Sequence, residues 1–299
     1  MLIYQSNHSN FYRNLAGVTL ILIGFSLFVI SIYHIGQRFG FLSEKMLQHT
    51  SSLDEIQSIK VNVPFDTEIL PAKQKQLQIQ IASQSIPQPT LVMSKQNKQL
   101  HIEIKPTTVH FLLRNKSKVR IIVPSSYHQS FILHTEGNLT ISGVRIKQTW
   151  SIDRLAIQST AGITKLDHLL LNQLMYKGTT GSLYGDQLKA HTSNFNILSG
   201  NLNLDQYTGK LDANIVSGKV QIELKELIKP THIKVISGNI RLSLPPSSAF
   251  SLDAITEHGH ISGKIPIRGL TTKQHWKGDY GQGKWPIRIE NKSGNISIQ

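Results

Sequence analysis

The sequence predicts an all-β protein, a β-solenoid of repeats of about 20 residues preceded by one N-terminal transmembrane helix. A turn of Ser or Thr, Gly and a further residue recurs at near-constant spacing, and apolar and polar residues alternate after it. One long uncharged apolar run lies near the N-terminus. The clearest copy of the repeat is residues 236–244, ISGNIRLSL, and Pro245 follows it.

The repeat continues from the middle of the chain to its last residues. Its anchoring glycines are Gly137, Gly162, Gly181, Gly200, Gly218, Gly238, Gly259 and Gly294. Successive glycines lie 18 to 25 residues apart, except the last pair, which lies 35 residues apart. A period near 20 is typical of stacked repeats, because a single copy cannot bury its apolar face alone. The alternative is a β-sandwich with short hairpins, which the near-constant spacing disfavours.

Each copy is interpreted as a turn followed by a half-buried strand. Glycine accepts positive φ at the turn, and the hydroxyl before it can bond to nearby backbone. Apolar residues at every second position are then expected to face the core. For residues 236–244 we expect buried aliphatic and exposed polar side chains: Ile236, Ile240, Leu242 and Leu244 buried, and Asn239, Arg241 and Ser243 exposed.

Composition excludes several kinds of chemistry. The chain has no cysteine, which rules out disulfides, thiolate metal sites and a cysteine nucleophile. The net charge of +14 favours contact with polyanions such as phospholipid headgroups or anionic envelope polymers. The basic residues are scattered, so an ordinary solvated surface explains them equally well, and we expect no nucleic-acid partner.

The N-terminal apolar run is interpreted as a signal anchor. Residues 14–37 contain no charged side chain, and residues 15–36 are long enough to cross a bilayer as a helix. A cleaved signal peptide is disfavoured, since the run is longer than a usual apolar region and lacks a small-residue cleavage site. A buried core helix is disfavoured by the polar flanks on both sides.

The predicted organisation has four parts. Residues 1–14 form a short cytoplasmic tail, 15–36 the transmembrane anchor, 37–55 a juxtamembrane connector and 56–299 an extracytoplasmic solenoid domain. The flanking positive charges are nearly balanced, so orientation depends on the shortness of the tail and the absence of cysteine. We expect a single-pass protein of the cytoplasmic (inner) membrane with its C-terminal domain outside the cytoplasm. The part of the domain before Phe131 lacks the repeated turn and is expected to cap the solenoid.

Several segments together resemble a known family. They are residues 119–123 (VRIIV), the repeated turns, residues 240–247 (IRLSLPPS) and the ending 287–298 (IRIENKSGNISI). They resemble the bacterial putative-adhesin family of β-strand repeats, which includes the LiaG-like proteins, over roughly residues 56–299. The resemblance implies a β-solenoid, often tethered to the cytoplasmic membrane and facing the envelope, and it carries over no catalytic residues.

No catalytic or metal site is predicted. His258 and His260 would share one face of a strand, with the carboxylates of Glu257 and Asp253 nearby. Zinc needs a third and usually a fourth ligand, so two exposed histidines that flank a turn glycine are the favoured interpretation. The sequence contains no phosphate-binding loop, no nucleophile elbow and no pair of acidic residues that stands out at neighbouring-strand spacing. We therefore expect no enzyme activity and no cofactor.

The long gap between Gly259 and Gly294 contains the candidate binding residues. Residues 265–288 are interpreted as an insertion in which aromatic rings stand beside lysines. Such rings suit sugar faces or a membrane interface, although they could equally cap the end of the solenoid. The candidate residues are Trp276, Tyr280, Trp285, Lys277 and Lys284.

These observations predict a membrane-anchored, envelope-facing, non-enzymatic binding or interaction module. The membrane is contacted through the N-terminal helix, and the expected partner is an anionic envelope polymer, a glycan or a protein. One alternative is a structural solenoid that polymerises end to end, and another is a glycan-active β-helix enzyme.

Overall fold

The computed structural model describes residues 45–83, 88–106, 117–144 and 149–299. The chain divides into two compact units, Met1–Lys45 and Met46–Gln299. Among the described residues, no helix is long and apolar enough to cross a membrane. The expected tail (1–14) and transmembrane anchor (15–36) lie outside the described residues.

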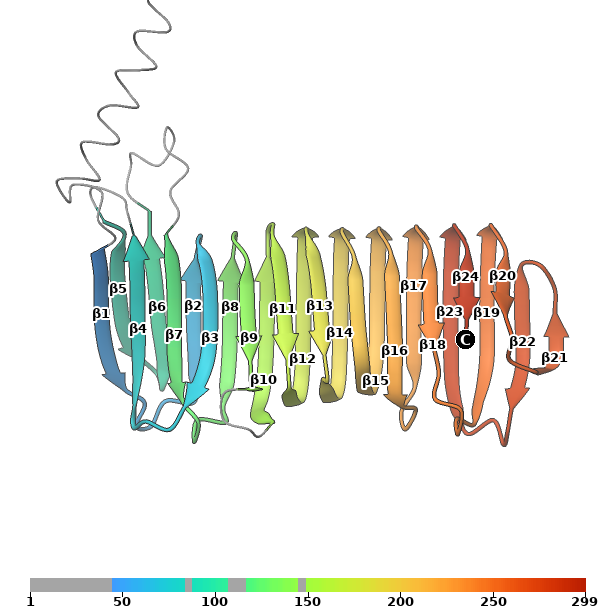
Figure 1. Ribbon diagram of the computed structural model, residues 1–299, viewed down its shortest axis with the longest axis horizontal. Helices are drawn as coiled ribbons and strands as arrows, with labels where there is room; N and C mark the ends of the chain where they lie inside the picture. Colours follow the sequence, from blue (N-terminus) through green and yellow to red (C-terminus); the bar gives the residue numbers. More distant parts are fainter. Residues whose placement is uncertain (1–44, 84–87, 107–116, 145–148) are drawn as a thin grey trace, which may run out of the picture. The chain divides into compact units, whose positions relative to one another are not determined.

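The second unit is an all-β solenoid, and each of its coils has two strands on opposite faces (Figure 1). Strands of equivalent position in neighbouring coils pair in parallel. The first face, here called face 1, contains β8 (Ser130–Thr135), β10 (Trp150–Ser159), β12 (Leu169–Thr180), β14 (Lys189–Ser199), the second part of β15 (Leu202–Ser217) and β17 (Thr231–Ser237). Face 2 contains β9 (Leu139–Ser142), β11 (Ile163–Asp167), β13 (Ser182–Asp186), the first part of β15, β16 (Val220–Glu226) and β18 (Ile240–Ser243). The core between the faces consists mainly of Ile, Leu and Val, as the repeat predicts.

Antiparallel strands cover the N-terminal end of the solenoid. β2 (Ser58–Val63) and β3 (Asp66–Ala72) form a coil between β8/β9 and the strands β6 (Gln99–Lys105) and β7 (Lys118–Pro124). β4 (Gln76–Ser83) is antiparallel to β7, and β5 (Thr90–Gln96) is antiparallel to β6. β1 (Lys45–Ser52) pairs with β4, and Leu47 packs against the core, so this part of the expected connector is a strand of the domain.

The C-terminal coils do not stack in chain order. β23 (Trp285–Ser293) and β24 (Ile296–Ile298) lie between β17/β18 and the strands β19 (Phe250–His258) and β20 (Ile261–Gly263). The stretch expected to be a loop insertion, residues 265–288, instead contains the hairpin of β21 (Arg268–Thr271) and β22 (His275–Tyr280). β22 pairs with β19 in antiparallel orientation and covers this end of the solenoid. The long gap in the repeat spacing is therefore the path of the chain around its own outermost coil.

The repeated glycine is explained by contact between the backbones of successive turns. Gly238 has φ of 148°, and a Cβ built on it would lie 1.7 Å from the carbonyl oxygen of Gly218. The same contact recurs between Gly218 and Gly200 at 1.7 Å, and between Gly294 and Gly238 at 2.0 Å. Any side chain in this column would force two coils apart, which is why the position is glycine.

The residue after the glycine forms a second ladder along the same turns. The side-chain oxygen of Asn201 accepts the N–H of Lys219 at 3.0 Å, and that of Asn239 accepts the N–H of Asn295 at 2.9 Å. Asn295 accepts the N–H of His260 at 3.1 Å in the same way. Each asparagine therefore binds the turn of the next coil. The sequence pattern predicts only that this residue is exposed and does not reveal this role.

The predicted strand register is confirmed in most of residues 236–244 and wrong at its first residue. Ile240 and Leu242 are 1% and 0% exposed, whereas Asn239 and Arg241 are exposed. Leu244 and Ser243 are both half-buried. Ile236 is 45% exposed, because β17 places Ile233 and Val235 inward and the turn then changes the phase of the alternation.

The asparagine ladder yields a stability prediction at Lys219. A lysine side chain offers no acceptor to the N–H of Asn239 in the next coil, so we expect Lys219→Asn to add one hydrogen bond. The free energy of unfolding should rise by about 1 kcal/mol, which would be measured as a higher urea midpoint. Lys219→Ala removes the same charge without adding an acceptor and should not stabilise. An equal rise in both variants would contradict the ladder explanation.

Candidate functional site

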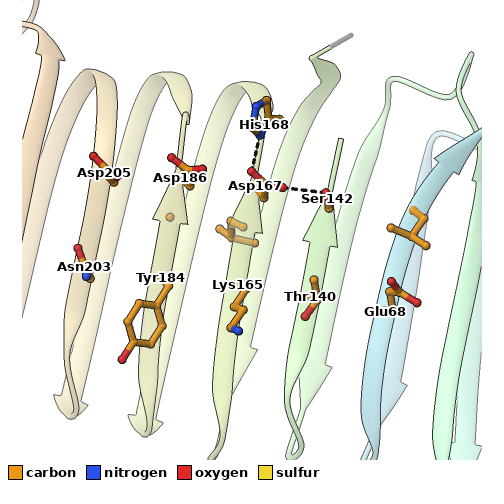
Figure 2. A pocket seen from close by; sticks show the side chains of 13 residues that line it. Glu68, Thr140, Ser142, Lys165, Asp167, His168, Tyr184, Asp186, Asn203 and Asp205 are labelled. Atoms are coloured by element: carbon orange, nitrogen blue, oxygen red, sulfur yellow. Dashed lines mark hydrogen bonds and ion pairs between the residues drawn. The ribbon is translucent and has the colours of Figure 1, made fainter. Parts of the chain in front are cut away.

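The site is an open groove of ≈ 620 Å³ on face 2, formed by strands of five coils from β3 to β15 (Figure 2). Except for His168, at the corner between β11 and β12, the polar and aromatic side chains in it come from successive parallel strands. They include Glu68, Lys165, Asp167, Tyr184, Asp186, Asn203 and Asp205.

Parallel register arranges the groove side chains into two rows. Asp167, Asp186 and Asp205 are direct register partners on β11, β13 and β15. Two residues earlier on the same strands, Tyr184 lies between Lys165 and Asn203. Because neighbouring strands are about 4.8 Å apart, the first row is a line of closely spaced carboxylates.

The carboxylate row lies at the edge of the solenoid where the chain leaves face 2 and turns back to face 1. We call this edge the aspartate edge. The residue after each aspartate, His168, Gln187 or Gln206, has φ of 53°, 49° or 51°. Left-handed backbone is uncommon for such residues, and here it makes the corner. The N–H of His168 donates to the Asp186 carbonyl at 3.0 Å, and that of Gln187 to the Asp205 carbonyl at 3.0 Å. Stacked backbone therefore holds the three carboxylates in place.

The three carboxylates differ in their partners. Asp167 accepts a hydrogen bond from the Ser142 hydroxyl at 2.9 Å and contacts the His168 imidazole (Figure 2). The side chains of Asp186 and Asp205 form no hydrogen bond with another residue in the described part of the chain. Tyr184, beside them, is 41% exposed. Within the described residues, the groove thus presents two carboxylates without a hydrogen-bond partner next to one accessible ring.

One cluster at this edge has the ligand types of a cation site, although the sequence predicted no metal. Ligand atoms of Asp167, His168 and Asp186 lie within 4.8 Å of one another, which could bring them around one ion. The Asp167 carboxylate and the His168 imidazole already pair with each other, and exposed acidic groups commonly occur without an ion, so the cluster by itself does not establish a metal site. His258 and His260, the pair considered from the sequence, are both exposed at another edge of the solenoid.

The prediction that no acidic residues stand out at neighbouring-strand spacing is wrong. The signal was present as LDHL at 166–169, GDQL at 185–188 and LDQY at 204–207. These motifs recur every 19 residues, in step with the glycine turns but on the opposite side of each coil. No glycine is repeated at this corner, where the left-handed residues are His168, Gln187 and Gln206, so the spacing of the glycines does not reveal it.

The predicted binding residues lie elsewhere, around the hairpin that ends the solenoid. Trp276, Tyr280 and Trp285 are half-buried and pack against the core. Tyr280 stacks on Phe250 with ring centroids 5.3 Å apart, and the Trp276 indole N–H donates to the Thr272 carbonyl at 3.0 Å. The predicted lysines, Lys277 and Lys284, are exposed, and the Lys284 ammonium lies 5.4 Å from the centre of the Trp285 ring. None of the five residues lines the groove.

Fold and groove together define a capped, two-sided β-solenoid with a polar surface groove. The chain belongs to the Toastrack DUF4097 family, whose model matches residues 56–299. Among curated proteins, none matches the chain. The family match confirms the expected membership in a family of β-strand repeat proteins over residues 56–299.

Several solved structures resemble the chain over most of its length at low identity. One is called a putative lipid binding protein from Parabacteroides distasonis, with 12% identity, a TM-score of 0.49, and coverage of 85% of this chain and 97% of that one. Another is a putative adhesin from the same species, with 12% identity, a TM-score of 0.47, and coverage of 86% and 98%. A putative adhesin from Parabacteroides merdae has 14% identity, a TM-score of 0.42, and coverage of 85% and 96%. None of these names denotes an enzyme.

The aromatic residues at the end hairpin give the next prediction. Since the rings pack on the core, we expect Trp276→Ala combined with Trp285→Ala to lower the melting temperature by about 5 °C or more. Lys277→Ala, on the same hairpin but exposed, is the control and should leave it unchanged. Thermal unfolding and binding to envelope extract would be measured together. Weaker binding at an unchanged melting temperature would instead establish the rings as a binding site.

Proposed function

We propose that the protein is a membrane-anchored, envelope-facing, non-enzymatic binding module that holds a glycan in the groove of face 2. The observation that carries this proposal is the pair of carboxylates of Asp186 and Asp205, which have no hydrogen-bond partner among the described residues, beside the exposed ring of Tyr184. Carboxylates accept hydrogen bonds from sugar hydroxyls, and an accessible aromatic ring offers an apolar surface to a sugar face.

Charge favours a neutral or amine-bearing glycan over an anionic polymer in this groove. Its lining includes four acidic residues, Glu68, Asp167, Asp186 and Asp205, and one lysine, Lys165. A surface of this sign repels polyanions. The anionic envelope polymer expected from the net charge would therefore have to bind elsewhere on the protein.

The arrangement of the carboxylates favours binding over hydrolysis. Glycoside hydrolysis uses two carboxyl groups that flank the scissile bond. Here Asp167, Asp186 and Asp205 lie in one row along the solenoid, and Glu68 is paired with Arg120 at 2.7 Å. Carboxylates in one row can bind successive units of a polymer, but they do not flank a scissile bond from two sides.

The ends of the domain disfavour end-to-end polymerisation. β22 covers the edge of β19, and β4 and β5 lie antiparallel against β7 and β6. A second copy stacked as a further parallel coil would have to displace these strands.

Membrane anchoring by residues 15–36 is supported by the uncharged run in the sequence. The orientation proposed here leaves the solenoid outside the cytoplasm. A fusion of alkaline phosphatase to the C-terminus should then be enzymatically active in cells, and a fusion to a reporter that works only in the cytoplasm should be inactive. The reverse pattern would overturn the envelope-facing location.

Glycan binding would be tested with the full chain in detergent on an array of bacterial envelope glycans. We expect Tyr184→Ala to weaken binding of a captured glycan about fivefold, since a stacked ring contributes about 1 kcal/mol. Gln221→Ala is the control, because Gln221 continues the same row but lies outside the groove. Both side chains are exposed, so melting temperatures should not change. Equal affinity in the two variants would refute the groove as the site, and turnover of the glycan would establish the enzyme alternative.

A further inference from the structure

A ladder of exposed aliphatic side chains runs along the other edge of the solenoid, where face 1 leads into the glycine turns. This edge is called the turn edge here. Leu198, Val216 and Ile236 are 54%, 42% and 45% exposed. They occupy the same position in three neighbouring coils, because the residues on either side of them are register partners. A shallow groove of ≈ 480 Å³ lies along them.

The solenoid core does not require this ladder. In each of the three coils the preceding residue, Ile197, Ile215 or Val235, points inward and fills the core. The equivalent positions in the flanking coils are polar, namely Thr179 and Lys292. Apolar side chains gathered at one exposed place indicate contact with an apolar partner.

Lysines surround the ladder. Lys177 and Lys234 line the same groove, Lys219 is exposed on the adjoining turn, and Lys292 is exposed at the ladder position of β23. Lys234 lies 3.7 Å from Glu290. The carboxylate row of face 2 stands at the aspartate edge, at the opposite ends of the strands. An apolar strip framed by lysines complements a surface that is anionic outside and apolar within.

The chain also enters the domain at the turn edge. β1 begins there and runs to the opposite edge, where the Lys95 ammonium donates to the Ser52 carbonyl at 2.7 Å (Figure 1). Met46, at the start of β1, is 63% exposed. Residues 37–45 separate it from the expected anchor, and nine residues span at most about 30 Å.

We propose that the turn edge lies on an anionic phospholipid bilayer, with the aliphatic ladder at the boundary between headgroups and acyl chains and the lysines on the phosphates. The proximity of the bilayer rests on the proposed anchor, whereas the lipid contact rests on the edge itself. In this orientation the aspartate edge and the row of carboxylates point away from the membrane.

The absence of cysteine makes a direct test possible, because one introduced thiol is the only one in the chain. Full-length Val216→Cys and Leu170→Cys would each carry an environment-sensitive fluorophore and be reconstituted into vesicles containing phosphatidylglycerol and nitroxide-labelled lipid. Leu170 is the matched control, since it is an aliphatic residue 39% exposed near the opposite end of the face 1 strands. We expect lipid quenching and a blue shift at position 216 and neither at position 170.

Charge variants test the role of the lysines. Lys177→Gln, Lys234→Gln and Lys292→Gln together should abolish most of the quenching at position 216. Each lost lysine should lower the equilibrium constant for contact with the bilayer about fivefold. Changing Lys189, Lys210 and Lys225 to Gln alters the net charge equally on the other edge and should leave the quenching unchanged. Loss in both triple variants would indicate a general charge effect and overturn the assignment of the edge.

Two readouts separate this proposal from the proposed anchor. Flotation of the full chain with vesicles reports on the anchor, and quenching at position 216 reports on the edge. Equal water exposure at positions 216 and 170 overturns the lipid-contacting edge, whether or not the chain floats. Quenching at position 216 that is equally strong in vesicles of phosphatidylcholine alone would refute the requirement for anionic lipid.

Discussion

Contact between the backbones of successive turns is the constraint on which the rest of this structure depends. The coils approach so closely at the glycine column that a Cβ at Gly200 would lie 1.5 Å from the carbonyl oxygen of Gly181. The asparagine after the glycine then binds the N–H of the next turn. Glycine permits the approach, and Asn201, Asn239 and Asn295 stabilise it in the coils where asparagine follows the glycine, so the turn sets the spacing and the register of neighbouring coils.

Because the register between coils is fixed, residues at equivalent positions of successive coils form rows on the surface. Such rows are the binding surfaces of this fold. A side chain repeated once per coil becomes a line with the spacing of neighbouring strands. Asp167, Asp186 and Asp205 make such a line at one edge, while Leu198, Val216 and Ile236 make another at the opposite edge. Opposite edges of the solenoid therefore differ in chemistry, which is compatible with one edge facing a membrane and the other facing a ligand.

A solenoid has two open ends, and this chain covers both by departing from the simple repeat. Antiparallel strands lie against the first and last coils, and the final strands of the chain insert beside β17 and β18. The C-terminal residues Ile296 and Ile298 are consequently buried in the stack rather than free at its end. The half-buried rings at the C-terminal hairpin follow from the same need, since apolar surface at an end must be covered.

The sequence by itself determined the all-β class, the period of the coils, the glycine turns and the inward position of Ile240 and Leu242, because these depend on local alternation and turn chemistry. It did not show that Ile236 faces outward, since the phase of the alternation changes at the turn. The aspartates of the carboxylate row recur every 19 residues in the sequence, but only the fold shows that they are neighbours on one face. The order of the terminal coils and the cap were decided by tertiary structure alone. The free backbone groups of an exposed strand edge can pair with any segment that reaches them, and no local sequence pattern specifies which segment does so.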